Sequence, residues 1–228
     1  MPQPTQAVLL DALGTLITFD PPAPRLRAAL RDRLGVEVSE EAAAAAMKAE
    51  ITYYRAHLHE GRDPASLHDL RVRAAAAMEP ALGLNPGVDA LLAALHFRAY
   101  PEVAPALREL RARGLRLIVV SNWDHSLHER LDETGIAALV DGAVASAEFG
   151  HAKPDAAIFA HAVELAGVPP EAALHAGDSP DADVAGALAA GLRAVLVARD
   201  ETPAVPADVP VIASLAELPG LCQYPQPR

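Results

Sequence analysis

The sequence predicts an α/β fold in which helices cover both faces of a doubly wound, Rossmann-like parallel sheet. Short apolar runs recur along the chain, and segments with helical periodicity lie between the later runs. Strands that are apolar on both faces and alternate with helices are typical of parallel sheets. A long stretch with helical patterns only follows the first run, which predicts an all-helical insertion into the sheet.

Each expected strand is an apolar run that ends in a small or polar residue. In chain order, the expected strands are Ala7–Leu10, Leu115–Val120, Gly142–Ala145, Ala173–Ala176 and Leu192–Val197. A further apolar stretch, Val209–Ser214, is a candidate edge strand. The expected helices between the later strands are Glu102–Arg113, His125–Thr134, Asp155–Ala166 and Asp181–Ala190.

The insertion is expected between Leu16 and about Tyr100, where the sequence has only helical patterns. Prolines lie near the starts of three of its expected helices, and Ser39 is the expected N-cap of the longest one. Because the insertion follows a carboxylate at the end of a strand, we expect it to form a lid over the site there. The expected domains are a Rossmann-like core, residues 1–17 and 100–228, and an all-helical cap, residues 18–99.

Composition and charge argue against several classes of function. The 228 residues are 51% hydrophobic and 21% charged, which is typical of a globular protein. The net charge of −11 and the lack of a basic patch argue against a nucleic-acid partner. No apolar run approaches the roughly 20 residues that span a membrane, and no signal peptide is expected. With one cysteine, Cys222, no internal disulfide is possible, and the expected location is the cytoplasm.

Polar side chains follow four of the expected strands. The carboxyl ends of parallel strands lie along one edge of the sheet, where α/β proteins bind their ligands. We therefore expect these side chains to converge although they are far apart in the sequence. In chain order, the candidate site residues are Asp11, Thr15, Ser121, Asn122, Lys153, Asp178 and Asp183.

These groups are chemically consistent with one another. The three carboxylates would repel strongly unless a cation lay among them, and Mg²⁺ prefers oxygen ligands. Asp11 is then suited to attack an electrophilic phosphorus, while the lysine, the hydroxyls and the amide bind the phosphoryl oxygens. Gly14 allows the chain to turn sharply after Asp11. We expect Mg²⁺ as the cofactor and a small phosphorylated molecule as the substrate; the sequence indicates no oligomeric state.

Four short motifs resemble those of the haloacid dehalogenase (HAD) superfamily of hydrolases, and they occur in the family's order. They are "DALGTL", "VVSN", "KP" and "GDSPDAD", and the resemblance covers roughly Ala7–Val197. It implies that Asp11 is the catalytic nucleophile and forms an aspartyl-phosphate. It also implies that Asp11, the backbone carbonyl of Leu13 and Asp178 bind Mg²⁺, with Asp183 supporting the metal directly or through water. The family's phosphoryl-binding residues correspond here to Ser121 and Lys153.

Leu13 departs from the family pattern. Most phosphatases of this family have a second Asp here, which protonates the leaving group and then activates the attacking water. Leucine can do neither, and the loss of such assistance typically costs roughly 10²–10⁴ in rate. One interpretation is a phosphatase whose leaving group needs no acid, or whose acid comes from elsewhere. The candidates for that acid are Asp124, His125, Tyr53, Tyr54, Arg55, His57 and His59.

Two other interpretations stay open. A 2-haloacid dehalogenase of this superfamily uses the same Asp to displace halide from carbon, which needs no proton donor. Such dehalogenases work without metal and lack the acidic residue that stands here as Asp178, which argues against this interpretation. A HAD-fold binding protein with weak or no turnover is the third interpretation, favoured by Leu13 and opposed by the four intact motifs.

Overall fold

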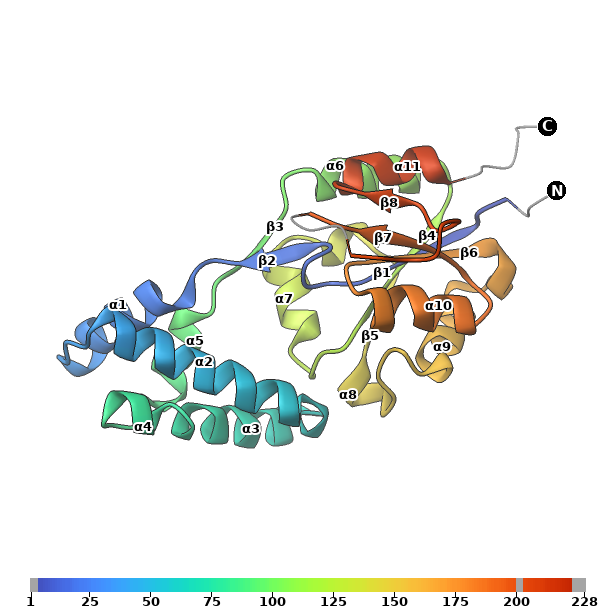
Figure 1. Cartoon of the computed structure of the whole chain (residues 1–228). Helices are drawn as coiled ribbons and strands as arrows, with labels where there is room; N and C mark the ends of the chain where they lie inside the picture. The colour runs from blue at the N-terminus through green and yellow to red at the C-terminus, as the bar shows by residue number, and fades with distance from the viewer. Residues whose placement is uncertain (1–3, 200–202, 223–228) are drawn as a thin grey trace. The chain divides into compact units, whose positions relative to one another are not determined.

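The computed structural model describes residues 4–199 and 203–222, which form two compact units (Figure 1). The sheet unit contains the described residues of Met1–Thr18, Ala99–Asn122 and Leu127–Arg228. The helical unit contains Phe19–Arg98 and Trp123–Ser126. Three segments of the expected core lie outside the described residues: 1–3, 200–202 and 223–228. The first of them belongs to the N-terminal stretch in which no signal peptide is expected.

The sheet unit is built on a parallel sheet with the strand order β5-β4-β1-β6-β7-β8. All residues of β1 are buried, and Leu9 pairs with Ile118 of β4 on one side and with His175 of β6 on the other. The predicted α/β fold is therefore confirmed, and β1 ends in the middle of the carboxyl edge. The strands are β1 (Ala7–Leu10), β4 (Arg116–Ser121), β5 (Gly142–Ala145), β6 (Ala173–Gly177), β7 (Arg193–Val197) and β8 (Val211–Ile212).

Helices cover both faces of this sheet: α6 and α11 lie on one face, and α9 and α10 lie on the other (Figure 1). The buried positions of α6 are spaced three or four residues apart, as in Val103, Leu107 and Leu110, so one side of the helix is apolar. On the opposite face, Phe159 of α9 belongs to a hydrophobic core cluster that also contains Leu9 and Ile118 of the sheet. The helices are α6 (Val103–Ala112), α7 (Leu127–Glu133), α8 (Ser146–Phe149), α9 (Ala156–Ala166), α10 (Gly186–Ala189) and α11 (Leu218–Leu221).

The helix expected at Asp181–Ala190 differs from the prediction, because its first part is a π-helical turn, Pro180–Ala185. The carbonyl of Ser179 accepts hydrogen bonds from the amides of both Asp183 and Val184. The second bond spans five residues, so it widens the turn beyond α-helical geometry. Such turns are frequent at functional sites, and this one contains Asp183.

Two short strands, β2 (Ile17–Phe19) and β3 (Phe97–Ala99), form a two-stranded sheet. The prediction of helical patterns alone between Leu16 and Tyr100 is therefore wrong at both ends. Strands of three residues are too short to show a period of two, and their partners are distant in sequence. The division between the two units falls within these strands, at Thr18 and at Arg98.

The helical unit has a hydrophobic core of its own, which includes Leu26, Leu30, Met47, Met78 and Leu91. Its longest helix begins as predicted, because Ser39 caps it by accepting a hydrogen bond from the amide of Ala42. None of the helices in the described ranges is long and apolar enough to cross a membrane. The helices are α1 (Pro22–Leu34), α2 (Glu40–His57), α3 (Pro64–Ala76), α4 (Glu79–Leu82) and α5 (Gly87–Ala94), with a 3₁₀ turn at Leu58–Glu60.

Candidate active site

Asp11 directly follows β1, and the residue is 6% exposed. Its backbone amide donates to the carbonyl of Ala176 in β6, which extends the strand pairing up to the site. The oxygen Oδ1 of Asp11 accepts hydrogen bonds from Ser121 Oγ at 3.1 Å and from Lys153 Nζ at 2.6 Å. Asp11 after β1, Ser121 at the end of β4 and Lys153 in the loop that follows β5 and α8 thus meet, as expected from the sequence.

The chain turns back tightly after Asp11, and glycine is required in this turn. Gly14 has a φ of +87°, which residues with a Cβ atom rarely adopt. A Cβ atom on Gly14 would also lie 2.2 Å from Oδ2 of Asp178. Thr15 is fully buried in the same turn, and its Oγ1 has no hydrogen-bond partner within the described part of the chain. The contact of Thr15 with a phosphoryl group remains a prediction, and so does metal binding by the carbonyl of Leu13.

Lys153 is 5% exposed and lies between two carboxylates. Its Nζ donates to Asp11 Oδ1 at 2.6 Å and to Asp183 Oδ1 at 2.5 Å. Burial opposes the positive charge, but the attraction of Asp11 and Asp183 outweighs burial and raises the pKa of Lys153. Lys153 is therefore fully charged at neutral pH.

Asn122 holds the backbone of Lys153, a role that was not expected from the sequence. Its Nδ2 donates to the backbone carbonyl of Lys153 at 2.9 Å, and its Oδ1 accepts from the backbone amide of Lys153 at 2.7 Å. Both ends of the Asn122 amide group are thus engaged by one backbone unit. Asn122 places Lys153 at the site, and the second N–H of its Nδ2 leaves binding of a phosphoryl oxygen by Asn122 as a prediction. The sequence could not distinguish binding of the Lys153 backbone from binding of a phosphoryl group, since both place an amide at a strand end.

Asp183 is almost completely buried, at 1% exposed, and both of its oxygens accept hydrogen bonds. Oδ1 accepts from Lys153 and from His175 Nε2 at 2.8 Å, and Oδ2 accepts from the amide of Ser179 at 2.9 Å. Burial alone would raise the pKa of Asp183, but Lys153 and then His175 reverse this and hold the pKa well below its usual range. A Cβ atom on Gly177 would lie 2.2 Å from Cγ of Asp183, so this packing requires glycine.

His175 is a site residue that the sequence analysis did not assign. It lies on β6 with its side chain fully buried, and the ring of Phe159 packs against it edge-on at 5.1 Å. Its Nε2 is bonded to Asp183, while Nδ1 has no partner among the described residues. The signal in the sequence was a histidine within an otherwise apolar strand, two residues before the glycine of "GD".

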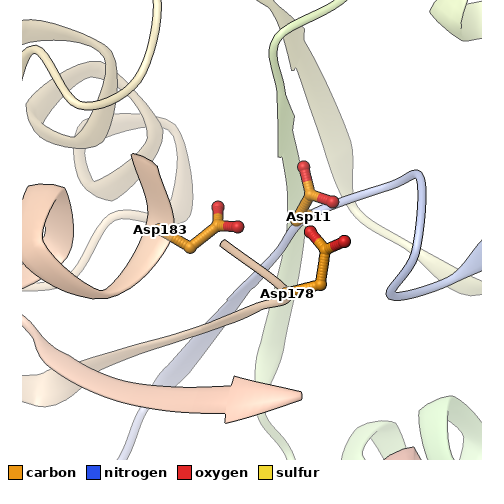
Figure 2. Close-up of side chains that lie close together, drawn as sticks. All are labelled: Asp11, Asp178 and Asp183. Atoms are coloured by element: carbon orange, nitrogen blue, oxygen red, sulfur yellow. The ribbon is translucent and has the colours of Figure 1, made fainter. Parts of the chain in front are cut away.

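Asp11, Asp178 and Asp183 form a cluster that could hold a metal ion. One ligand atom from each lies within 4.8 Å of the other two, and Figure 2 shows the three side chains gathered at the strand ends. Distances alone would allow Asp183 to be a direct ligand. Because both of its oxygens already accept hydrogen bonds from protein groups, Asp183 is better suited to act through water.

Burial and mutual repulsion raise the pKa of two of the three carboxyl groups in this cluster. Burial raises the pKa of Asp11 to about 6, since the lowering effect of Lys153 is partly cancelled by Asp183 and Asp178. Burial and the charge of Asp183 likewise raise the pKa of Asp178. Carboxylates that resist ionisation are stabilised by a cation, and an all-oxygen donor set fits a hard divalent ion such as Mg²⁺. The residues present therefore fit the expected metal.

Fold and site together define a class of enzyme. The family model for haloacid dehalogenase-like hydrolases matches residues 5–191, and the chain belongs to this family. The similarity to individual relatives is strong but partial. The haloacid dehalogenase-like hydrolase domain-containing protein 3 of Bos taurus is 43% identical over 106 residues, which are 46% of this chain and 42% of that protein.

A second curated relative and a solved structure are named for two different activities, a phosphatase and a dehalogenase. The phosphoserine phosphatase of Thermus thermophilus is 42% identical over 108 residues, which are 47% of this chain and 43% of that enzyme. The chain thus spans less than half the length of these curated relatives. The crystal structure of a 2-haloacid dehalogenase from Pseudomonas syringae is 27% identical with a TM-score of 0.63, and the match covers 95% of this chain and 97% of that chain.

Proposed function

We propose that the protein is a Mg²⁺-dependent phosphatase that hydrolyses a small phosphorylated metabolite through an aspartyl-phosphate on Asp11. The carboxylate cluster carries this proposal. Three carboxylates lie together and Lys153 is the one lysine or arginine bonded to them among the described residues, so two negative charges are in excess. A divalent cation would balance them and allow an anionic phosphoryl group to approach. The phosphoserine phosphatase among the relatives supports the same chemistry.

In this proposal, Asp11 attacks the phosphorus, and the bond to the leaving group breaks with its electron pair. Water then attacks the phosphorus of the aspartyl-phosphate, which releases phosphate and regenerates Asp11. The contacts of Lys153 and Ser121 with Oδ1 hold the Asp11 carboxylate in one orientation before the reaction. Asp11, Asp178 and the carbonyl of Leu13 would hold Mg²⁺, with Asp183 supporting it. Bound Mg²⁺ would offset the negative charge that develops on the phosphoryl oxygens.

Leu13 limits the substrates that such a site can use well. The carboxylates of the cluster are all assigned to the nucleophile or the metal, which leaves no proton donor beside the leaving group at position 13. Asp124 is engaged within the helical unit, where its Oδ1 accepts from Ser126 N at 2.8 Å and Ser126 Oγ at 2.5 Å. We therefore expect the best substrates to have leaving groups that depart without protonation, as acyl and aryl phosphates do.

The remaining sequence predictions complete the proposal. The helical unit would act as the cap, residues 18–99, and exclude water until the substrate is aligned. The partner would be a small phosphorylated molecule in the cytoplasm, with neither nucleic acid nor a membrane involved. The substrate itself is left unnamed, because no motif in the helical unit indicates one.

Phosphate release from p-nitrophenyl phosphate and acetyl phosphate tests this function. The wild type, Asp11→Asn and Asp181→Asn are compared with Mg²⁺ and with EDTA. Asp181 is an exposed carboxylate outside the metal cluster, so Asp181→Asn is the matched control. We expect Mg²⁺-dependent turnover that falls by roughly 10³ or more in Asp11→Asn and is unchanged in Asp181→Asn. Absence of turnover, or turnover equal in wild type and Asp11→Asn, contradicts the proposal.

A 2-haloacid dehalogenase is the second candidate. The similarity to the Pseudomonas syringae enzyme favours it, and so does Leu13, because displacement of halide from carbon needs no proton donor. Asp178 argues against it, since a carboxylate beside the nucleophile is of no use without a cation. Halide release from 2-chloropropionate in the presence of EDTA would establish this alternative. A protein silent in both assays would fit the binding-protein interpretation.

A further inference from the structure

The turn after the nucleophile bonds the amides of residues 14–17 internally but relies on an outside group for two of its carbonyls. The amides of Thr15, Leu16 and Ile17 all donate to the carbonyl of Ala12, and the amide of Gly14 donates to the carbonyl of Ile17. The carbonyls of Gly14 and Thr15 are instead bonded by a side chain from outside the turn. Buried backbone carbonyls need such partners, so the source of these bonds affects the shape of the turn.

That side chain is Arg199, which lies just beyond the end of β7. Its Nε donates to the carbonyl of Gly14 at 2.9 Å, and its Nη2 donates to the carbonyl of Thr15 at 2.7 Å. Its Nη1 donates to Glu102 Oε1 at 2.7 Å, which balances the charge. The planar, forked guanidinium group is suited to binding two adjacent oxygens at once.

Arg199 also connects the turn to the segment at which the chain re-enters the sheet unit. Its guanidinium carbon lies 3.4 Å from the centre of the Tyr100 ring, and the amide of Tyr100 donates to the carbonyl of Leu16 at 3.1 Å. The guanidinium group of Arg199 is therefore contacted by the turn, by the ring of Tyr100 and by Glu102. Such a cation restricts the turn in more than one direction.

The position of this turn bears on the chemistry. Only the absence of a Cβ atom on Gly14 leaves room for Asp178, so a small shift of the turn changes the space that this carboxylate occupies. The turn also contains Thr15 and the carbonyl of Leu13. Misplacement of reacting groups by about 1 Å can lower a rate by roughly 10².

We infer that Arg199 is a positioning residue: it binds the carbonyls of Gly14 and Thr15 and thereby holds the turn after Asp11 in its catalytic shape. The effect on turnover rests on the phosphatase function proposed above. The effect on the turn does not, because it follows from the hydrogen bonds alone. The two parts can therefore be tested separately.

Arg193 provides a matched control. It is a partly buried arginine at the other end of β7, and its Nη2 donates to Thr5 Oγ1 at 2.7 Å. Arg199→Met, Arg199→Lys and Arg193→Met would be compared with the wild type, and circular dichroism would establish that each variant is folded. Arg199→Lys keeps the positive charge but lacks the forked guanidinium group. It therefore separates the effect of the charge from that of the paired hydrogen bonds, and it is the less disruptive change.

The first measurement is amide hydrogen exchange over residues 12–17, without substrate and with no metal added. We expect exchange there to be at least 10-fold faster in Arg199→Met, less accelerated in Arg199→Lys, and unchanged in Arg193→Met. Exchange at the wild-type rate in Arg199→Met overturns the inference. The same holds if Arg193→Met accelerates exchange in this turn equally. This measurement stands even if the wild type hydrolyses no phosphate ester.

The second measurement is turnover of p-nitrophenyl phosphate with saturating Mg²⁺. A loosened turn should lower kcat about 10-fold or more in Arg199→Met and change KM less than 3-fold, with partial recovery in Arg199→Lys. Arg193→Met should keep wild-type kcat. Equal kcat in the wild type and Arg199→Met would overturn the role in positioning, whereas an inactive wild type would instead overturn the proposed function.

Discussion

Lys153 shows how one residue holds a site together before any ligand binds. It is bonded to Asp11 and to Asp183, and all three side chains are nearly inaccessible to water. Removing one partner from a buried ion pair leaves the other charge without compensation. Asn122 in turn fixes the backbone of Lys153. The position of the nucleophile thus depends on residues from the segments that follow three different strands, and these segments are far apart in sequence.

Gly14 permits the sharpest test at the level of a single residue. In Gly14→Ala, the new Cβ atom would lie 2.2 Å from Asp178 Oδ2, and the residue would keep a positive φ. We expect the backbone strain to lower stability by about 1–3 kcal/mol and the displaced carboxylate to lower Mg²⁺-dependent turnover by roughly 10². Urea unfolding and kcat/KM for p-nitrophenyl phosphate would measure the two effects.

Gly114→Ala is the control for this prediction. Gly114 has a φ of +81°, but a Cβ atom there would meet nothing within 4 Å. This variant should therefore show a similar loss of stability and full activity. If Gly14→Ala keeps wild-type turnover, the close approach of the turn to Asp178 has no catalytic importance.

At the level of elements, α2 contains a buried carboxyl group that its surroundings do not compensate. Glu50 is 4% exposed, and burial raises its pKa to about 7. One turn later, Tyr54 has a pKa well above its usual value because of burial and the nearby Asp124. Both shifts show that the surroundings of this part of α2 disfavour negative charge.

Glu50 makes the stability of the helical unit depend on pH. Its pKa is higher in the folded state than in the unfolded chain, so the folded state holds the proton more tightly. Stability is therefore highest below about pH 4.5 as far as Glu50 is concerned, and it falls as the pH rises towards 7. We expect Glu50→Gln to be neutral near pH 4.5 and to stabilise the unit at pH 8 by at most about 3 kcal/mol.

Chemical denaturation of both proteins at these two pH values would check the prediction. Glu37→Gln, at an exposed position in the same unit, is the control and should change neither result. A gain in stability of Glu50→Gln that is equal at both pH values would show that the buried charge is not its cause.

The π-helical turn is the element that brings Asp183 to the site. The two hydrogen bonds to the carbonyl of Ser179 widen the turn, and the side chain of Ser179 caps it by accepting from the amide of Ala182. The amide of Ser179 also donates to Asp183 Oδ2. This residue therefore shapes the turn through its backbone and side chain alike, although the sequence analysis treated it only as part of the motif.

At the level of the whole molecule, Mg²⁺ binding should stabilise the folded chain, because a ligand that binds only the native state raises its stability. A free Mg²⁺ concentration 100-fold above Kd corresponds to about 2.7 kcal/mol. We expect added Mg²⁺ to raise Tm in the wild type and in Asp181→Asn, but not in Asp178→Asn. An equal rise of Tm in all three proteins would show that the metal binds outside the carboxylate cluster.

The sheet and the cluster of charged residues could be predicted because each signal is local. Asp11 and Asp178 follow runs of apolar residues, and parallel strands bring such ends to one edge. Arg199 could not be found in this way, since it bonds backbone carbonyls 185 and 184 residues earlier in the chain. Carbonyls have no signature in a sequence. The strands β2 and β3 escaped prediction for a similar reason, because pairing with a distant segment stabilises them more than their own composition does.

The four residues Trp123–Ser126 have a consequence for exchanging parts between family members. They belong to the helical unit although they directly follow Ser121 and Asn122, and the amide of His125 donates to the carbonyl of Gly61 at 2.8 Å. The helical unit is therefore not a single contiguous insertion. A chimaera that transplants residues 19–98 alone would separate these four residues from the unit to which they belong. A graft intended to transfer the helical unit intact should include both segments.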